Sequence, residues 1–557
     1  MYEPLATLAD DYWAYSLEHS PTEGLIYGNY EHADQMEDLS RSGEDAAIER
    51  LNGFADAAEA IDAGVLSADE RVTRAVLIEE ARGAATELTR RHAEFAVDHT
   101  MGFHVTLLQL VPQLVAPTPE VADALVAKWS KLGGTFDDLV KRLRQGIARD
   151  RTPPRIAVER TIAQIDAYLE TSVSTDPFTL ATGPEEFDAA ADEAWRDRLR
   201  DTVRDVVRPA YAAYRNALRN EVLPKAREPE ESGVRWLNDG EGLYADAIRR
   251  HTSLDLTPLA IHQIGLDEIA SLEDEYRELG SRILGTSNVS EIYERLRNDP
   301  DLRFTTAEDI VATAESVMAR AKAAVPAWFG RLPRADCVMA EIPQGAEDGP
   351  LAYYLPPAVD GTRPGTYFIN TTEPTSRTRF EAEALAFHES IPGHHLQLAL
   401  AQELEDIPDF RKHALVTVYV EGWGLYTERL ADEMGLYTDD LSRLGILSFD
   451  SWRAGRLVVD TGMHALGWGR REAIEWMAAN SPQALNNIAN EVDRYIAWPG
   501  QALAYKLGQR EFFRLRREAE AHMGSQFDIK AFHDVVLGSG PVPLGVLGDL
   551  VAAWSTP

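Results

Sequence analysis

Residues 384–401 form a mostly apolar stretch with a group of polar side chains at its centre. His388, Glu389, His394 and His395 fall within eight consecutive residues of it. A chain cannot bury such side chains among apolar ones unless each of them finds a polar partner. A metal ion is such a partner, because zinc accepts neutral histidine nitrogens at about 2.0–2.1 Å. We therefore expect a fold that gathers these side chains around one zinc ion per chain.

The spacing of these residues differs from the HExxH motif, in which two histidines four residues apart reach zinc from one helix face. Position +4 after His388 is Pro392, which cannot donate a backbone hydrogen bond and disfavours a helical residue before it. We expect the helix to break across residues 390–393 and to restart near Pro392. His394 then needs the smaller distortion and is the predicted second ligand, with His395 as the alternative.

A third ligand is required, since a catalytic zinc site takes three protein ligands and leaves one position for water. Glu421 follows the mostly apolar run 414–420 and precedes two glycines that allow another backbone to approach. We predict that Glu421 is this ligand. Glu428 lies seven residues later on the same helical face, so it is the alternative ligand or a partner of a ligand. A solvated helix charge beside Arg429 would explain Glu428 equally well.

Four motifs in this part of the chain resemble those of the family called domain of unknown function 885. They are HESIPGHHLQ (388–397), YVEGWGLYTE (419–428), RLVVDTGMHALGW (456–468) and RYIAWPGQALAYKLGQ (494–509). That family is similar to helical zinc peptidases of the thimet oligopeptidase and angiotensin-converting enzyme type. The resemblance implies a mainly α-helical, gluzincin-like fold with zinc on two helices. It leaves open which histidine of the pair 394 and 395 binds.

Helical periodicity dominates the rest of the chain, and no Ser/Gly-rich or Pro-rich linker divides it. We expect a single helical domain over residues 1–557, with a central cleft between two lobes of about residues 1–330 and 331–557. The exception is the segment 336–372, which predicts a small sheet near the metal helix. Its expected strands cover residues 338–342, 352–355 and 366–369.

The last of these strands is a candidate for substrate binding. Zinc peptidases commonly hold the substrate backbone along an edge strand beside the metal, so we assign this task to the segment from Tyr367 to Asn370. A structural hairpin without substrate contact is the alternative.

Amide hydrolysis also needs a hydrogen-bond donor for the oxyanion. His464 lies four residues after Asp460 on one helical face, so His464 oriented by Asp460 is one candidate. The phenol of Tyr505 is another. Arg456 is expected to hold a substrate carboxylate, because a guanidinium group binds carboxylates through two parallel hydrogen bonds. Buried structural hydrogen bonds or salt bridges are the alternative explanation for each of these residues.

Composition narrows the class of partner. The net charge of −36 and the pI near 4.8 argue against nucleic acid and anionic membranes as partners. Cys337 is the single cysteine, which excludes an intramolecular disulfide and fits a reducing cytoplasm. No basic and apolar leader and no run of 18 apolar residues occurs. We expect a soluble cytoplasmic protein, and the sequence does not fix its oligomeric state.

These observations predict a zinc-dependent metallohydrolase, most simply a peptidase of the oligopeptidase or carboxypeptidase kind acting on short peptides. His388, His394 and Glu421 hold the zinc ion. Glu389 takes a proton from the attacking water and delivers it to the leaving amine. Two alternatives remain, a zinc hydrolase of non-peptide amides or esters and a catalytically inactive helical protein that binds peptides.

Overall fold

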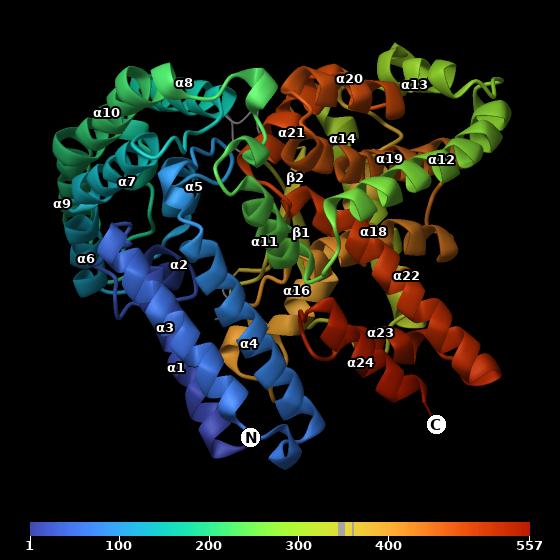
Figure 1. The fold of residues 1–557 in the computed structure, drawn as a ribbon, viewed down its shortest axis with the longest axis horizontal. Helices are drawn as coiled ribbons and strands as arrows, with labels where there is room; N and C mark the ends of the chain where they lie inside the picture. Colours follow the sequence, from blue (N-terminus) through green and yellow to red (C-terminus); the bar gives the residue numbers. More distant parts are fainter. Residues whose placement is uncertain (343–350, 359–360, 362, 557) are drawn as a thin grey trace.

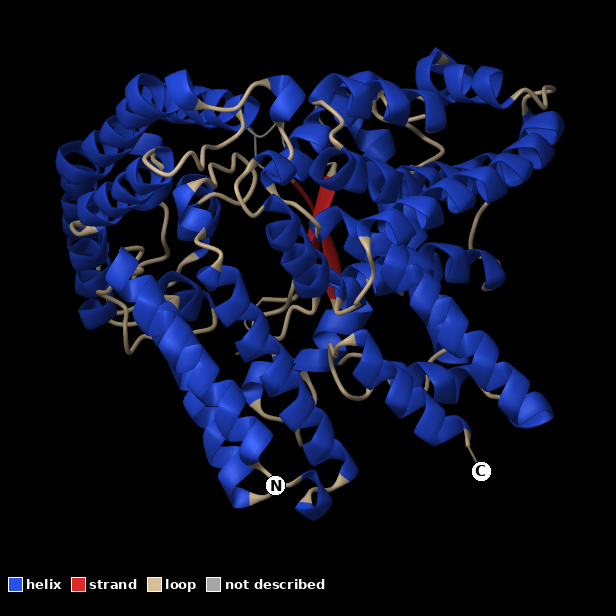
Figure 2. Cartoon of the chain, in the orientation of Figure 1, coloured by secondary structure: helices blue, strands red, loops and turns tan. Residues whose placement is uncertain are grey.

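The computed structural model describes residues 1–342, 351–358, 361 and 363–556 of the chain. The described chain is mainly α-helical, with one small sheet (Figure 2). The N-terminal helices are α1 (Glu3–His19), α2 (Pro21–Ile26), α3 (Arg41–Ala60), α4 (Ala68–Thr89), α5 (Phe103–Leu110), α6 (Pro119–Trp129), α7 (Leu132–Ile147), α8 (Arg155–Glu170), α9 (Ala189–Thr202) and α10 (Arg208–Ala217). The prediction of a mainly helical fold with a small sheet is confirmed.

The C-terminal part of the chain adds a second series of helices. They are α11 (Gly240–Thr252), α12 (Pro258–Ile283), α13 (Val289–Asn298), α14 (Ala307–Ala324), α15 (Ala382–Glu389), α16 (His394–Gln402), α17 (Asp409–Lys412), α18 (Thr417–Glu433), α19 (Asp440–Thr461), α20 (Arg470–Asn480), α21 (Leu485–Ala497), α22 (Ala504–Met523), α23 (Ile529–Leu537) and α24 (Leu544–Ser555). Within the described residues, no helix combines the length and the apolar character needed to cross a membrane.

The hydrophobic cores do not follow the predicted division near residue 330. One core lies entirely between residues 25 and 226 and includes Trp129 and Tyr211. It fills the arch of α6 to α10 at one side of the molecule (Figure 1). The largest core joins residues of α3 and α4, such as Phe54, to Trp423 and Phe512 of the C-terminal helices. The N-terminal helices therefore pack with the part of the chain that carries the candidate ligands.

The sheet has three strands, β1 (Cys337–Glu341), β2 (Ala352–Leu355) and β3 (Gly365–Ile369), in the order β1-β3-β2. All three lie where the sequence predicts them. β3 is parallel to β1 and antiparallel to β2, so Tyr367 pairs with Met339 on one side and with Tyr354 on the other. A central strand has no free edge for a substrate, because both neighbours take its backbone hydrogen bonds. The expectation that the strand of Tyr367 lies at an edge is therefore wrong.

Two glycines allow α18 and α22 to cross at close range. A Cβ atom on Gly422 would lie 2.5 Å from the Cα atom of Gly508, and one on Gly508 would lie 2.2 Å from the carbonyl oxygen of Val418. Neither position has room for a side chain, because each faces backbone atoms. Gly422 follows Glu421, and Gly508 lies one turn after Tyr505. The crossing thus sets the distance between two residues predicted to be functional.

Candidate metal centre

The chain between α15 and α16 brings His394 back beside His388. α15 ends at Glu389, and α16 begins at His394. The Ser390 side chain caps the preceding turn by donating a hydrogen bond to the carbonyl oxygen of Ala386 at 2.6 Å. At Gly393 a Cβ atom would lie 1.9 Å from the carbonyl oxygen of His388, so only glycine fits this turn. The predicted break across residues 390–393 is confirmed.

The side chains of His388, His394 and Glu421 converge. One ligand atom from each residue lies within 4.8 Å of the other two. Glu421 Oε2 is 3.9 Å from His388 Nε2 and 3.5 Å from His394 Nε2. Tetrahedral zinc at 2.0–2.1 Å from its ligands would separate two of them by about 3.3 Å. The donor types and their spacing therefore fit a zinc ion after small movements of the side chains.

Glu428 holds the far side of the His388 ring. Its Oε1 atom lies 2.8 Å from His388 Nδ1, and its side chain is fully buried. Gly424 closes one face of the ring, since a Cβ atom there would lie 2.8 Å from His388 Nε2. A carboxylate on the second nitrogen fixes the tautomer and the ring orientation of metal-binding histidines. Glu428 is thus a partner of His388, and the alternative of a solvated helix charge is wrong.

Electrostatics couple these residues strongly. Burial lowers the pKa of His388, but hydrogen bonds to Glu421 and Glu428 outweigh it and raise that pKa to about 9. Burial raises the pKa of Glu421, but hydrogen bonds to His388 and His394 outweigh it and lower that pKa far below its usual range. The group is thus negatively charged enough to hold a proton tightly, and a metal ion would compete with that proton.

His395 faces away from the other two histidines. Its Nδ1 atom lies 2.9 Å from the hydroxyl of Tyr354, and its Nε2 atom lies 3.2 Å from the carbonyl oxygen of Ala335. Burial lowers its pKa to about 4, so the ring is neutral. One residue of helix rotates a side chain by about 100°, which explains why only one of two adjacent histidines reaches the cluster. The structure does not bring the alternative ligand to the site.

The end of α15 carries Glu389, the predicted base. The side chain is half-buried, and no described residue forms a hydrogen bond with its carboxylate. Burial raises the pKa of the Tyr367 phenol, and the charge of Glu389 raises it further. The predicted substrate contact of Tyr367 is wrong, because its backbone already pairs with β1 and β2 on the two sides of β3.

Asn370 is also unavailable for the predicted contact with substrate. It is 2% exposed, and its side-chain oxygen accepts a hydrogen bond from the backbone N–H of Thr372 at 3.1 Å. Its backbone N–H donates to the carbonyl oxygen of Leu351 at 3.0 Å. The structure therefore contradicts substrate binding by Asn370, because the residue closes the turn after β3.

His464 does not reach the candidate ligands. Its Nδ1 atom accepts a hydrogen bond from the backbone N–H of Val234 at 3.1 Å, and its Nε2 atom lies 2.9 Å from the carbonyl oxygen of Tyr495. Asp460 does not orient it, since its carboxylate accepts hydrogen bonds from the Tyr244 hydroxyl and the Gly500 N–H. Both nitrogens of His464 serve the backbone, so its predicted role as oxyanion donor is wrong.

Tyr505 does lie near the cluster. Burial raises the pKa of its phenol, and the charge of Glu421 raises it further, whereas Arg456 lowers it. The guanidinium carbon of Arg456 is 4.3 Å from the centre of the Tyr505 ring. Arg456 donates to the Tyr495 hydroxyl and to Glu491, each at 2.8 Å. Glu421 thus acts electrostatically on Tyr505, and Arg456 packs on the Tyr505 ring while it donates to two protein partners.

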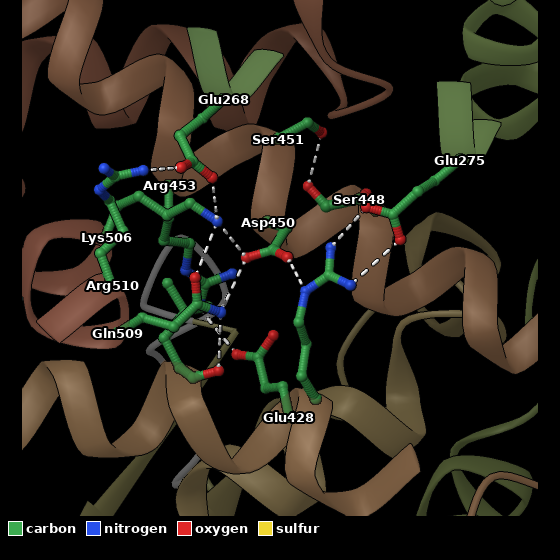
Figure 3. A network of polar contacts seen from close by, with 12 residues as sticks. Glu268, Glu275, Glu428, Ser448, Asp450, Ser451, Arg453, Lys506, Gln509 and Arg510 are labelled. Atoms are coloured by element: carbon green, nitrogen blue, oxygen red, sulfur yellow. Dashed lines mark hydrogen bonds and ion pairs between the residues drawn. The ribbon is translucent and has the colours of Figure 1, made fainter. Parts of the chain in front are cut away.

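A buried polar network behind the site did not emerge from the sequence. Asp450 accepts hydrogen bonds from Lys506 at 2.9 Å, from Gln509 at 3.0 Å and from Arg429 at 2.5 Å (Figure 3). Burial raises its pKa, but the charges of Arg429 and Lys506 outweigh it and hold that pKa far below its usual range. The network links α18, α19 and α22. The sequence feature that could have indicated it is Asp450, a charged residue in the buried helix α19.

Comparison with known proteins places the chain in one family. Its structure is similar to the crystal structure of a protein from Colwellia psychrerythraea provisionally named a lipoprotein, at 27% identity and a TM-score of 0.92, over 99% of this chain and 98% of that one. A protein from Shewanella oneidensis, provisionally named a lipoprotein of unknown function, shares the fold at 17% identity and a TM-score of 0.74, over 98% and 99% of the two chains. No curated protein matches the sequence. The model of the family "Bacterial protein of unknown function (DUF885)" matches residues 21–551, so the chain belongs to that family.

Proposed function

We propose that this protein is a zinc-dependent metallohydrolase that cleaves short peptides. The observation that carries the proposal is the convergence of His388, His394 and Glu421, with Glu428 on the second nitrogen of His388. Two imidazoles and a carboxylate, with one ring held by a further carboxylate, form the donor set typical of catalytic zinc sites. The helical architecture is compatible with the gluzincin-like fold and with the thimet oligopeptidase and angiotensin-converting enzyme type, which we also propose.

A zinc ion held by these three residues would supply Lewis-acid activation of water and of the scissile carbonyl. Glu389 takes the proton of the attacking water on its carboxylate and delivers it to the leaving amine. Its position supports this role, because it follows His388 directly, is half-buried and accepts no hydrogen bond from a described residue.

Tyr505 is the proposed donor to the carbonyl oxygen of the substrate. Burial raises the pKa of its phenol, with the charge of Glu421 acting in the same direction, so the hydroxyl keeps its proton at neutral pH. A neutral donor beside the site stabilises the negative charge that develops on that oxygen. The phenol therefore replaces His464 in the proposed mechanism.

The adjacent histidines provide the sharpest test of the metal site. We expect purified protein to carry about one zinc ion per chain and to hydrolyse members of a short-peptide panel. His394→Ala should lose zinc and activity, whereas His395→Ala is the matched control and should keep the metal. Elemental analysis and mass spectrometry of the peptides measure both properties. Equal zinc content in the two variants would contradict the proposed ligand set.

The substrate panel separates the peptidase from its alternatives. It contains short peptides, N-acyl amino acids and esters, each incubated with zinc-loaded protein. Turnover restricted to N-acyl compounds or esters would identify a hydrolase of non-peptide substrates. Tight peptide binding without turnover would identify an inactive peptide-binding protein.

The cellular compartment also belongs to this proposal. Cys337 is half-buried and has no second cysteine in the chain to pair with, which fits a reducing cytoplasm. Fractionation of the native host, followed by immunodetection of this protein, tests it. Recovery in the membrane fraction would contradict a cytoplasmic location.

A further inference from the structure

Arg453 and Arg456 present unpaired guanidinium nitrogens on the side of the site that carries Tyr505. Both residues lie on α19 and are only 5% and 3% exposed. Among the described residues, the buried Nε and Nη1 atoms of Arg453 and the buried Nη1 atom of Arg456 have no hydrogen-bond partner. Such donors are rarely left unpaired in a folded protein, because burial removes the water that would satisfy them.

Arg453 forms a long ion pair with Glu428 but no direct hydrogen bond to it. The Oε1 atom of Glu428 is 3.9 Å from Arg453 Nη2, which is within ion-pair range and beyond hydrogen-bond distance. Glu428 instead accepts from His388 at 2.8 Å. Arg429, a half-buried arginine of α18, is different, because Asp450 and Glu275 together neutralise it. Among the described residues, Arg453 thus has one long ion pair and two buried N–H groups without a hydrogen-bond acceptor.

Aromatic side chains fix the two guanidinium groups without neutralising them. The guanidinium carbon of Arg453 is 4.3 Å from the ring centre of Phe449 and 4.5 Å from that of Trp452. The guanidinium carbon of Arg456 is 4.6 Å from Trp452 and 4.3 Å from Tyr505. Stacking on ring faces orients the planar groups and leaves their N–H edges for an acceptor.

Tyr505 connects this pair to the candidate metal centre. The guanidinium carbon of Arg453 is 6.0 Å from the centre of the Tyr505 ring, and that of Arg456 is 4.3 Å from it. Tyr505 also lies one turn before Gly508, which packs against Gly422, the residue after Glu421. A peptide whose carbonyl oxygen meets Tyr505 would extend past that ring toward the two arginines. The acceptor that suits them is a carboxylate, because a guanidinium group binds its two oxygens through parallel hydrogen bonds.

We propose that Arg453 and Arg456 form a carboxylate subsite, so that the preferred substrates are peptides with a carboxylate close to the scissile bond. This inference rests on the proposed peptidase function. The carboxylate is either the C-terminus of the peptide or the side chain of an aspartate or glutamate. The chemistry recognised is the same in both cases, and the two sources differ in which peptides would be cleaved.

The first experiment compares three peptides on zinc-loaded full-length protein. They are Ala-Ala-Phe-Ala with a free C-terminus, the same peptide amidated, and amidated Ala-Ala-Glu-Ala. We expect at least one carboxylate-bearing peptide to have a KM about tenfold or more below that of the neutral amide, with kcat changing less. Preference for the free acid identifies the C-terminus, and preference for the glutamate peptide identifies the side chain. Equal KM values for all three would overturn the inference.

A variant then tests the residues. Arg453→Gln should raise KM for the preferred carboxylate peptide about tenfold or more and leave the neutral amide within about twofold. Arg471→Gln is the matched control, because this arginine of α20 is 90% exposed. An Arg453→Gln protein that folds and cleaves both peptides with wild-type KM values would exclude Arg453 from the subsite. If the variant does not fold, the comparison of peptides on wild-type protein still decides the inference.

Measurements of peptide binding distinguish a wrong carboxylate subsite from a wrong assignment as a peptidase. If wild-type protein cleaves none of the peptides, the proposed peptidase is wrong. Isothermal titration calorimetry with the same three peptides then tests the subsite alone. Tighter binding of a carboxylate peptide than of the neutral amide would support it, and equal or absent binding of all three would overturn it.

Discussion

At the level of single residues, the two carboxylates beside His388 have different roles, one as a proposed metal ligand and one as the hydrogen-bond partner of a ligand. Glu421 faces Nε2 of that ring at 3.9 Å, whereas Glu428 lies 2.8 Å from Nδ1 on the other side. The two carboxylates are seven residues apart on α18, so one helix serves both nitrogens of the same imidazole. Their roles differ because Glu421 is 20% exposed at its side chain and Glu428 is fully buried.

Glu389→Gln tests whether the site performs chemistry. The change keeps the size and hydrogen bonding of the side chain but removes the base. Zinc content should stay near one per chain, while turnover of a cleaved peptide should fall by at least ~10²-fold, the low end for general acid–base catalysis. Elemental analysis and initial rates measure the two quantities.

Glu421→Gln is the comparison for that variant. It should lose zinc and activity together, since its charge belongs to the ligand set. Near-normal turnover of Glu389→Gln would show that another group accepts the proton. If both variants kept zinc equally well, the assignment of Glu421 as a ligand would be wrong.

At the scale of elements, the crossing of α18 and α22 decides whether the site is assembled. Glu421 and Glu428 lie on α18, and Tyr505 and Lys506 lie on α22. Lys506 donates to Asp450 of α19 at 2.9 Å, which ties the third helix to this pair. The helices are held by backbone contact at two glycines and by buried charge pairing, so a small separation would move several functional groups together.

Gly508→Ala tests this coupling. The new methyl group would lie 2.2 Å from the carbonyl oxygen of Val418, so the helices must separate. We expect a loss of about 1–3 kcal/mol in unfolding free energy, typical of overpacking, together with weaker zinc binding. Urea denaturation and metal titration measure these effects.

Gly53→Ala in α3 is the matched control for Gly508→Ala. A Cβ atom there meets nothing within 4 Å. The control should equal the wild type or gain up to about 1 kcal/mol, because alanine favours the helix. A Gly508→Ala protein as stable as this control, with unchanged zinc affinity, would show that the crossing does not position the site.

At the scale of the whole molecule, buried histidines make stability depend on pH. Burial lowers the pKa of His104 and His464 to about 4 and that of His533 to about 3. An unfolded histidine has a pKa of about 6.5, so between pH 4 and 6.5 the unfolded state binds more protons. Stability should therefore decrease as pH falls through this window. Asp460 opposes the trend, because burial raises its pKa to about 7. His388 opposes it above pH 6.5, since hydrogen bonds to Glu421 and Glu428 outweigh burial and raise its pKa to about 9. His395, whose pKa burial lowers to about 4, adds to the loss of stability.

The expected size of this effect can be measured directly. Each buried histidine should remove about 1.4 kcal/mol of unfolding free energy between pH 7.5 and 5.5. His533→Gln should shrink that difference by about this amount, whereas His522→Gln, at an exposed position, should not change it. Chemical denaturation at the two pH values gives the numbers. Equal wild-type stability at both would contradict the prediction.

Short-range patterns in the sequence account for the local features of this protein. The helical pattern, the three short strands and the helix break at Pro392 were predictable, because periodicity and proline geometry act over a few residues. The grouping of His388, His394 and Glu421 was also predictable. Polar side chains buried in apolar helices need polar partners, and one metal ion can serve all three. The position of each residue along its helix limits where such an ion can lie.

The long-range contacts between these elements depend on how the helices and strands pack in three dimensions. Strand order made β3 central, and this removed Tyr367 and Asn370 from substrate binding. Packing against Val234 and Tyr495 gives both ring nitrogens of His464 backbone hydrogen-bond partners. The side chains of His394 and His395 point in different directions, so only His394 reaches the candidate metal site. The unpaired donors of Arg453 can be identified only from the positions of all its neighbours in the folded protein. The physical reason is that burial and hydrogen-bond partners come from segments distant in sequence, which no local pattern encodes.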